Sequence, residues 1–328
     1  MSNVSLFQFA TSELSQDAFI CWLLSCSDPQ SGIDQALHQA GRDFLSSLFA
    51  VAEIEPPAEL TKVEVKKQYK NIDIVVLVND ESHVLVIEDK VFTGAHSGQL
   101  ERYSKIAKEV FSNSEIGFIY FKTGNQSSFE KADKANYKIY RREQFLEVLD
   151  RGIQNDVSNH IFLDYKSYLA GIEESIQAYK HKALDDWDWN CWTGFFTNLQ
   201  QNYLDDAEWG HVPNAAGGFM GMWWHGRDNK YLQLEQEKLC FKIIVEDKDL
   251  QSDARNKWHA EVVQLSEQSG LNLCKPDRFG KGEFMTAAVL NDGDYRRTNA
   301  DGTLDIAKTV SVLKEAERLL DNAVPITG

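Results

Sequence analysis

The pattern of apolar and polar positions predicts a compact group of strands in the first half of the chain. Residues 61–70 (TKVEVKKQYK) alternate, while residues 72–78 (IDIVVLV) and 83–91 (HVLVIEDKV) are rich in β-branched side chains and flank a turn-like NDES segment. The last two segments therefore predict a hairpin, preceded by a third strand. Two further strands are expected over 116–124 and 137–142.

Along the sequence, apolar residues at helical spacing occur before, between and after these strands. A helix has 3.6 residues per turn, so apolar residues three and four positions apart share one face that can pack on a sheet. The predicted helices span residues 11–26, 33–51, 97–111, 143–152 and 158–182. Helices combined with buried strands predict an α/β core.

The composition changes at residues 184–190 (LDDWDWN) toward tryptophan and acidic side chains. We place a boundary there, with a first domain over 1–182 and a C-terminal accessory α+β domain over 183–328. The expected elements of the second domain are an antiparallel meander over 218–247 and helices near 250–269 and 304–322. Seven of the eight tryptophans follow residue 180; they are expected mainly in cores, although an indole can also stack on an unpaired base.

The overall composition narrows the class of protein. The sequence has no apolar run close to the roughly 20 residues needed to cross a bilayer, and its first residues lack the pattern of a signal peptide. We therefore expect a cytoplasmic protein without membrane contact. The five cysteines are scattered and form no C-x-x-C pair, which argues against both a disulfide framework and a zinc site.

Charge is unevenly distributed along the chain. The net charge of −16 argues against a broad electrostatic grip on nucleic acid. Residues 61–150, however, carry 14 basic and 14 acidic side chains, so this region is the least repulsive toward a polyanion. Lys66 and Lys70 share one face of the first strand and could bind phosphates, but lysines also protect edge strands from aggregation.

The apolar run at residues 84–87 ends in three charged side chains, Glu88, Asp89 and Lys90. Alternation places Glu88 and Lys90 on one face of the strand and Asp89 on the other. If the turn is centred between residues 80 and 81, partners whose numbers sum to 161 face each other, and Asp73 lies opposite Glu88. A slip of one residue would pair Asp73 with Asp89 instead.

Two facing carboxylates repel each other, and a divalent cation removes the conflict. Oxygen ligands suit Mg²⁺, with Mn²⁺ as a substitute. A lysine beside such a cation could orient or deprotonate water, or stabilise developing negative charge. Asp73, Glu88 and Lys90 therefore indicate phosphodiester hydrolysis.

The spacing of these residues resembles the signature of the PD-(D/E)XK nuclease superfamily. Asp73 is followed on the next strand by Glu88-Asp89-Lys90, and a Gln-x-x-x-Tyr pattern, Gln99 and Tyr103, begins the next helix. The resemblance covers roughly residues 10 to 150. It implies a restriction-endonuclease-like core of a helix, a three-strand meander, a helix and a strand.

The resemblance also implies roles for individual residues. Asp73 and Glu88 would bind the metal, the backbone carbonyl of Asp89 would be a third ligand, and Lys90 would be the catalytic lysine. Gln99 and Tyr103 would accompany the active site. Members often add an acid from the first helix, for which Glu13 is the candidate and Asp17 the reserve. The strict motif has proline before the first aspartate, where this chain has Ile72.

Structural explanations remain open for each of these residues. The charged strand end could be an ordinary salt bridge, although a buried ion pair is a weak stabiliser. Gln99 could be solvated and Tyr103 a core residue, and Glu13 could simply favour its helix N-terminus. His96, which precedes the Gln-containing helix, could assist at the site or be structural.

A second Glu-Asp-Lys segment occurs at residues 246–248. Folding that strand back through its EQEK turn places Arg227, and not an acid, opposite Glu246, although a slip of one residue would bring Asp228 there. No Gln-x-x-x-Tyr helix follows. We interpret this segment as the solvated end of a strand.

The leading hypothesis is a Mg²⁺-dependent phosphodiesterase that acts on nucleic acid, with DNA favoured over RNA. A second hypothesis is a catalytically inactive relative that serves as a binding or regulatory module. A third is the nuclease subunit of a defence or restriction assembly whose partner selects the target. Formation of a homo-oligomer, or binding to a partner protein, is left open.

Overall fold

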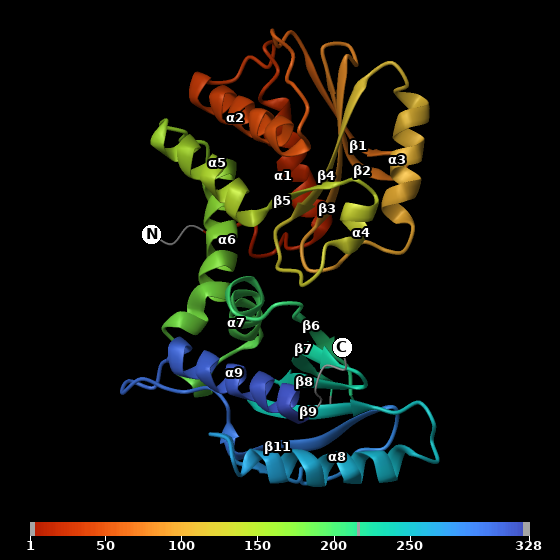
Figure 1. Ribbon diagram of the computed structural model, residues 1–328. Helices are drawn as coiled ribbons and strands as arrows, with labels where there is room; N and C mark the ends of the chain where they lie inside the picture. Colours follow the sequence, from red (N-terminus) through yellow and green to blue (C-terminus); the bar gives the residue numbers. More distant parts are fainter. Residues whose placement is uncertain (1–3, 215–216, 324–328) are drawn as a thin grey trace. The chain divides into compact units, whose positions relative to one another are not determined.

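The computed structural model describes residues 4–214 and 217–323 (Figure 1). The chain forms two compact units, Met1–Glu174 and Ser175–Gly328, which we call unit 1 and unit 2 and treat separately. The assignment of domains to residues 1–182 and 183–328 stays a prediction. None of the helices in the described part of the chain combines the length and apolarity needed to cross a bilayer.

A mixed five-stranded sheet forms the centre of unit 1. Its strands lie in the order of the sequence, with β1, β2 and β3 antiparallel and β3, β4 and β5 parallel. The strands are β1 (Val63–Tyr69), β2 (Ile72–Val78), β3 (His83–Lys90), β4 (Glu115–Lys122) and β5 (Lys138–Arg141). All five were expected from the sequence, and no end differs by more than two residues from its expected position.

The register of the β2–β3 hairpin is the one predicted from the sequence. Ile74 lies opposite Ile87, and the pairing continues to Val78 opposite His83. The turn is made by Asn79, Asp80 and Glu81, all with positive φ. The residue numbers of each facing pair therefore sum to 161 along the hairpin. The slipped alternative, in which Asp73 would lie on the same face as Asp89, is wrong.

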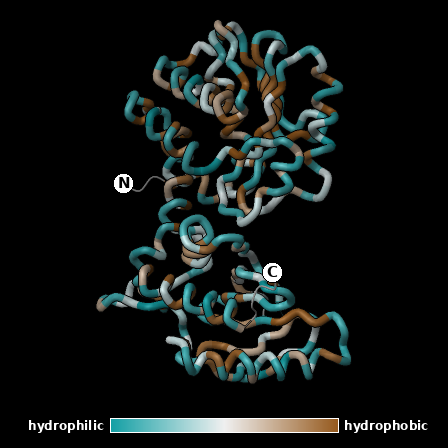
Figure 2. Tube along the Cα trace, viewed as in Figure 1, coloured by the Kyte–Doolittle hydropathy of each residue, from teal (hydrophilic) through white to brown (hydrophobic). Residues whose placement is uncertain are grey.

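Helices cover both faces of the sheet (Figure 1). Leu85 and Ile87 of β3 pack into a core with α1, α2, α5 and α6, whereas Val84 and Val86 pack into a core with α3 and α4. These helices are α1 (Glu13–Ser25), α2 (Gln35–Ala52), α3 (Gln99–Val110), α4 (Glu130–Lys134), α5 (Arg142–Gln154) and α6 (His160–Gln177). In Figure 2 apolar residues concentrate along the central strands, as expected for a sheet buried on both faces.

The expected α/β core, with its helix, three-strand meander, helix and strand, is therefore present. The short helix α4 of unit 1 was not expected from the sequence. The expected helix over 158–182 ends earlier, at Gln177, and a 3-10 turn, Ala178–Lys180, follows it.

Unit 2 contains an antiparallel six-stranded sheet in the order β10-β11-β9-β8-β7-β6, packed with three helices. The strands are β6 (Glu208–Val212), β7 (Phe219–Arg227), β8 (Lys230–Glu235), β9 (Lys238–Ile244), β10 (Leu273–Cys274) and β11 (Phe284–Asp294), and the helices are α7 (Trp189–Asn202), α8 (Gln251–Ser266) and α9 (Ile306–Ala323). The predicted meander is β7, β8 and β9, and the two predicted helices are α8 and α9. The expected α+β architecture is confirmed.

Helix α7 was not expected from the sequence, because its aromatic residues were interpreted as a change of composition. Asp188 starts the helix, since its side chain accepts hydrogen bonds from the backbone N–H groups of Asn190 and Cys191. Trp192 and Phe195 then enter the core of unit 2. Trp209, Trp224 and Trp258 are buried in the same core, which confirms the packing role expected of these tryptophans.

Candidate active site

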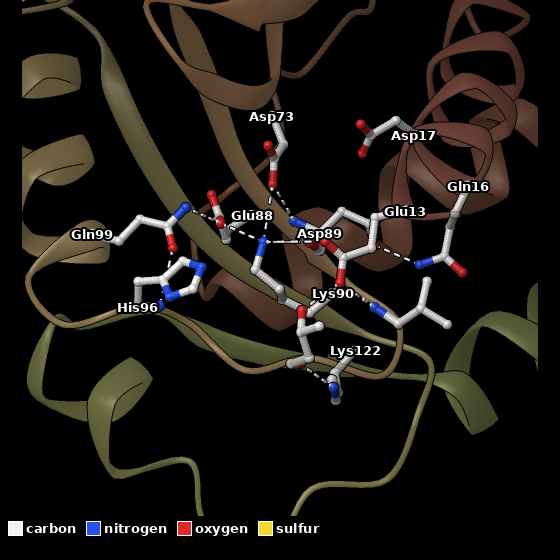
Figure 3. A network of polar contacts seen from close by, with 12 residues as sticks. Glu13, Gln16, Asp17, Asp73, Glu88, Asp89, Lys90, His96, Gln99 and Lys122 are labelled. Carbon is white, nitrogen blue, oxygen red and sulfur yellow. Dashed lines mark hydrogen bonds and ion pairs between the residues drawn. The ribbon is translucent and has the colours of Figure 1, made fainter. Parts of the chain in front are cut away.

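Three charged side chains meet at the end of the β2–β3 hairpin (Figure 3). The Nζ atom of Lys90 lies 2.6 Å from Oε1 of Glu88 and 3.5 Å from Oδ2 of Asp73. It also donates a hydrogen bond of 2.8 Å to the backbone carbonyl oxygen of Asp89. The ammonium group of Lys90 therefore contacts the same three groups that the sequence suggested as metal ligands.

Burial controls the ionisation of this cluster. Glu88 is fully buried, and burial, together with the nearby Asp73 carboxylate, raises the pKa of Glu88 to about 7, against the opposing effect of Lys90. Burial alone would lower the pKa of Lys90, but Glu88 and Asp73 raise it above its ordinary value. Lys90 is thus held as a cation, which suits it to stabilising negative charge and orienting water rather than accepting a proton.

Asp89 participates mainly through its backbone. Its N–H donates a 3.1 Å hydrogen bond to Oδ2 of Asp73, while its side chain lies on the opposite face of β3 and accepts a 2.5 Å hydrogen bond from Nε2 of Gln16. Burial and the neighbouring Asp17 carboxylate raise the pKa of Asp89. The predicted division of the three charges between the two faces is confirmed.

Gln16 is a polar residue of α1 that the sequence analysis did not single out. Its Oε1 accepts hydrogen bonds from Oγ1 of Thr123 (2.8 Å) and from the hydroxyl of Tyr165 (2.9 Å), while its Nε2 donates to Asp89. This buried amide fixes the end of β3 against α1. The available signal was its position four residues before the buried Ile20, on the same helix face.

The two acidic candidates of α1 occupy different places. Oε1 of Glu13 accepts hydrogen bonds from Oγ1 of Thr93 (2.6 Å) and the backbone N–H of Val91 (3.3 Å), and Oε2 lies 3.9 Å from Nζ of Lys90. Glu13 therefore lies at the edge of the charged cluster. Asp17 instead lies 3.8 Å from Nζ of Lys67, and burial, with the Asp73 carboxylate, raises its pKa to about 6.

The start of α3 brings the glutamine of the Gln-x-x-x-Tyr pattern to the cluster. Nε2 of Gln99 donates a 2.7 Å hydrogen bond to Oε1 of Glu88 and lies 3.4 Å from the hydroxyl of Tyr103. Oε1 of Gln99 accepts from the backbone N–H of His96, whose ring is exposed. Gly98, with a φ of 67°, precedes the helix in a left-handed conformation that glycine adopts without strain.

Lys122 of β4 is a second buried lysine near the cluster, and the sequence analysis did not name it. It lies beside Lys90 in the parallel register, and its Nζ donates a 2.5 Å hydrogen bond to the carbonyl oxygen of Thr93. Burial lowers the pKa of Lys122 to about 8, although Glu13 and Asp89 act in the opposite direction. A lysine at the end of an apolar run was the available signal, as it was for Lys90.

The two lysines proposed as phosphate ligands lie on or beside the edge strand β1. Nζ of Lys66 is 3.5 Å from Oε1 of Glu64, and the exposed Lys70 is in the turn that leads to β2. The residue that links this region to the cluster is Gln68, whose Nε2 donates a 3.2 Å hydrogen bond to Oδ1 of Asp73.

The donor atoms of the cluster fit a hard divalent cation. They are the carboxylates of Asp73 and Glu88 and the carbonyl oxygen of Asp89, and oxygen donors of this kind suit Mg²⁺. Within residues 4–214 and 217–323, Oε2 of Glu88 is buried without a hydrogen-bond partner. The same residues contain no group of three or more His, Cys, Asp or Glu side chains suited to a metal.

The second Glu-Asp-Lys segment has a different environment. Strand β9 ends at Ile244, and Glu246, Asp247 and Lys248 follow it as exposed residues. The β8–β9 pairing has the predicted register, with Lys230 opposite Ile243. The expected place of Arg227 opposite Glu246 is wrong, because β8 begins only at Lys230 and Arg227 lies at the end of β7, paired with Lys230. The interpretation of this segment as a solvated strand end is confirmed.

Comparison with known proteins identifies the family of the chain. Residues 4–186, more than half of the sequence, match the model of the PD-(D/E)XK nuclease superfamily. No curated protein and no solved structure gave a significant match. The matched region contains the whole β2–β3 hairpin, the charged cluster and the Gln99 helix. On this evidence the chain belongs to the PD-(D/E)XK nuclease superfamily.

Proposed function

We propose that the protein is a metal-dependent nuclease that hydrolyses phosphodiester bonds of nucleic acid, with DNA favoured over RNA. The observation that supports this most strongly is the meeting of Asp73, Glu88 and Lys90 at one strand end, inside the region that matches the family. A core gains little stability from such a buried group of charges, so a chemical role is the better explanation.

Asp73 and Glu88 would hold Mg²⁺ through their carboxylates, with the carbonyl oxygen of Asp89 as the third protein ligand. The bound ion would polarise the scissile phosphate and lower the pKa of a water molecule. Mn²⁺ is expected to substitute, because it also prefers oxygen ligands.

The protein's own side chains would prepare the site for this chemistry. The Lys90 ammonium lies beside both carboxylates and would stabilise negative charge on the phosphate as it develops. Gln99 would orient Glu88 through its 2.7 Å hydrogen bond. Glu13 would fix the segment after β3 by accepting hydrogen bonds from Val91 and Thr93.

The test is a cleavage assay with purified full-length protein. Plasmid, linear duplex, single-stranded DNA and RNA are incubated with Mg²⁺ or Mn²⁺, and with EDTA as a blank. Glu88→Ala and Lys90→Ala should each reduce the rate by roughly 100-fold or more. Glu246→Ala and Lys248→Ala are matched controls from the exposed copy of the same tripeptide and should retain the wild-type rate.

Cleavage that persists unchanged in Glu88→Ala and Lys90→Ala would sink the site assignment. Absence of cleavage on every substrate, with intact binding to nucleic acid or to a partner protein, would favour the inactive binding module. Comparing the DNA and RNA substrates in one experiment decides the preference for DNA.

A further inference from the structure

The six-stranded sheet of unit 2 has one face occupied by the core and a second face with a different composition. Met220 and Met222 of β7 point into the core with Leu234 of β8. Because side chains alternate along a strand, Phe219 and Trp223 lie on the other face. The register across the sheet extends that face to further strands, since Trp223 is paired with Gln233 on β8, and Gln233 with Cys240 on β9.

This second face contributes to a hollow of about 980 Å³, which we call the sheet hollow. Its aromatic lining includes Phe219, Trp223 and Tyr231, which are half-buried, and Phe284, which is 58% exposed. Aromatic surface in contact with water is unfavourable, and covering it with a planar ligand would be favourable. Exposed aromatic groups gathered in one hollow therefore indicate a binding site.

Two glycines allow neighbouring side chains to pack closely against the backbone of this face. Gly210 of β6 and Gly221 of β7 are paired across the sheet. A Cβ atom on Gly221 would lie 3.3 Å from the ring of Phe219, and one on Gly210 would lie 3.9 Å from the ring of Trp223. The rings of Phe219 and Trp223, together with the Val212 side chain, which would lie 2.9 Å from a Cβ atom on Gly221, thus pack close to the backbone of these two strands.

Polar side chains line the hollow next to the aromatic rings. Gln233 and Lys242 are 7% and 8% exposed. Oε1 of Glu235 accepts hydrogen bonds of 3.1 Å from both Nε2 of Gln233 and Nζ of Lys242, and Lys242 also donates to Oγ1 of Thr286. Donors and acceptors therefore lie side by side, as needed to recognise the polar edge of a planar heterocycle.

Five of the nine Asp, Glu, Lys and Arg side chains that line the hollow are paired within the protein, and the other four are Asp205, Asp206, Asp228 and Lys230. Lys242 is paired with Glu235, and Lys314 with Glu317 at 2.9 Å. Arg227 is paired with Asp321 at 2.8 Å. The hollow consequently offers aromatic faces and hydrogen-bonding edges, and this matches an uncharged heteroaromatic group better than a strongly charged ligand.

We propose that the sheet hollow binds an unpaired base of a nucleic-acid strand. Trp223 and Tyr231 would stack on the base, while Gln233 would contact its edge. Lys230 also lines the hollow, and its Nζ lies 4.3 Å from the centroid of the Trp258 ring. Bases inside a duplex are stacked on one another, so the hollow would select single-stranded or locally opened nucleic acid. The choice of polymer rests on the proposed nuclease function.

The test measures binding by the full-length protein in EDTA, so that no strand is cut. A labelled single-stranded DNA oligonucleotide is titrated and followed by fluorescence anisotropy, beside an abasic oligonucleotide of equal length and charge and an RNA of the same sequence. Trp223→Ala should weaken binding of the base-containing DNA roughly tenfold or more, and Gln233→Leu severalfold. Trp189→Ala is the matched control, because Trp189 is 45% exposed on α7 and is not among the residues that line the hollow.

Equal affinity for the abasic and the base-containing oligonucleotide would overturn the proposal, as would equal effects of Trp223→Ala and Trp189→Ala. Saturable binding of a free nucleoside monophosphate without binding of the oligonucleotide would also overturn the proposal, because the ligand would then be a small molecule and not a nucleic-acid strand. Gln233→Leu keeps nearly the same side-chain volume and serves if Trp223→Ala fails to fold. Cleavage is measured separately on wild-type protein with Mg²⁺, so specific binding without cleavage would leave the sheet hollow intact and contradict only the nuclease function.

Discussion

The two Glu-Asp-Lys segments of this chain have the same three residues and opposite environments. Residues 88–90 are buried at the end of a central strand of unit 1, while residues 246–248 are exposed beyond the end of β9 in unit 2. Asp73 meets the first copy from the neighbouring strand, whereas β8, the neighbour of β9, begins at Lys230 opposite Ile243, so no residue of β8 lies opposite the second copy. The same tripeptide thus forms a buried charged cluster only where the topology adds an opposing acid and excludes water.

The helix that follows each copy also differs. Gln99 begins α3 and donates its amide to the Glu88 carboxylate. Gln251 begins α8, but its amide donates to the backbone carbonyl of Val245. The second copy therefore has a glutamine in a similar helical position without a carboxylate for it to orient.

The largest expected difference between the copies concerns stability. Lys90→Met removes the cation between the buried Glu88 and Asp73 carboxylates and should destabilise unit 1 by about 3 kcal/mol near neutral pH. Lys248→Met changes an exposed side chain and should alter stability by no more than about 0.5 kcal/mol. Hydrogen exchange of the β3 and β9 amides, measured by mass spectrometry, compares the two variants.

The same variant has a predicted pH dependence. Without Lys90, the pKa of Glu88 would rise further above its unfolded value, because the opposing effect of the lysine is lost. A carboxyl group with a raised folded-state pKa contributes stability at low pH and loses it as the pH rises through that pKa. The exchange rate of Lys90→Met should therefore approach that of wild type near about pH 5; a loss of stability independent of pH would contradict this electrostatic explanation.

The second effect concerns metal binding. The pKa of Glu88 is about 7, so below neutrality the carboxyl group is mostly protonated and must release its proton to bind a cation. Apparent Mg²⁺ affinity should fall by roughly tenfold per pH unit below that value. Calorimetric titration in two buffers of different ionisation enthalpy measures the proton release, and binding without release would refute the role of Glu88.

A smaller effect is expected from the two glutamines. Gln99→Leu removes the hydrogen bond to Glu88 and should reduce the maximal cleavage rate roughly tenfold, because the carboxylate loses its orientation. Gln251→Leu is the matched control and should leave the rate unchanged. Equal rates for the two variants would show that Gln99 has no positioning role.

The smallest effect on cleavage should come from adding an acid next to the second Glu-Asp-Lys segment. Asn229→Asp places an acid beside Ile244 at the end of β9, next to the second copy, but the segment stays exposed and beyond the strand end. In a Glu88→Ala background this change should restore no cleavage. Recovery of metal-dependent activity would show that an opposing acid suffices without burial.

The sequence predicted the first unit well because its signals are local and agree with one another. β-Branched runs, a turn at residues 79–82 and the period-two alternation determine the faces on which Glu88 and Asp89 lie, and the structure has this arrangement. Glu13 also lies where the sequence suggested, near Lys90. Gln16 and Lys122 were missed because their partners, Asp89 and the Thr93 carbonyl, are brought near only by tertiary packing.

Unit 2 was less predictable for a physical reason. Its helix α7 consists largely of aromatic and polar residues with weak helix propensity, and it is stabilised by the Asp188 cap and by burial of Trp192 and Phe195. Strand β11 pairs with β9 through two register shifts, so no simple alternation runs along it. The polar lining of the sheet hollow likewise depends on cross-strand pairing that a single sequence does not specify.

The position of Lys90 among three oxygen acceptors has an evolutionary consequence. The lysine is the countercharge of its own acids, so a lineage that abandons catalysis cannot discard it alone without leaving Asp73 and Glu88 in buried repulsion. Replacements should therefore accumulate in pairs, with the lysine and one of the acids lost together or exchanged for uncharged residues of similar volume. Descendants that keep the fold but not the chemistry would carry this paired signature, and a lone substitution at Lys90 should be rare among them.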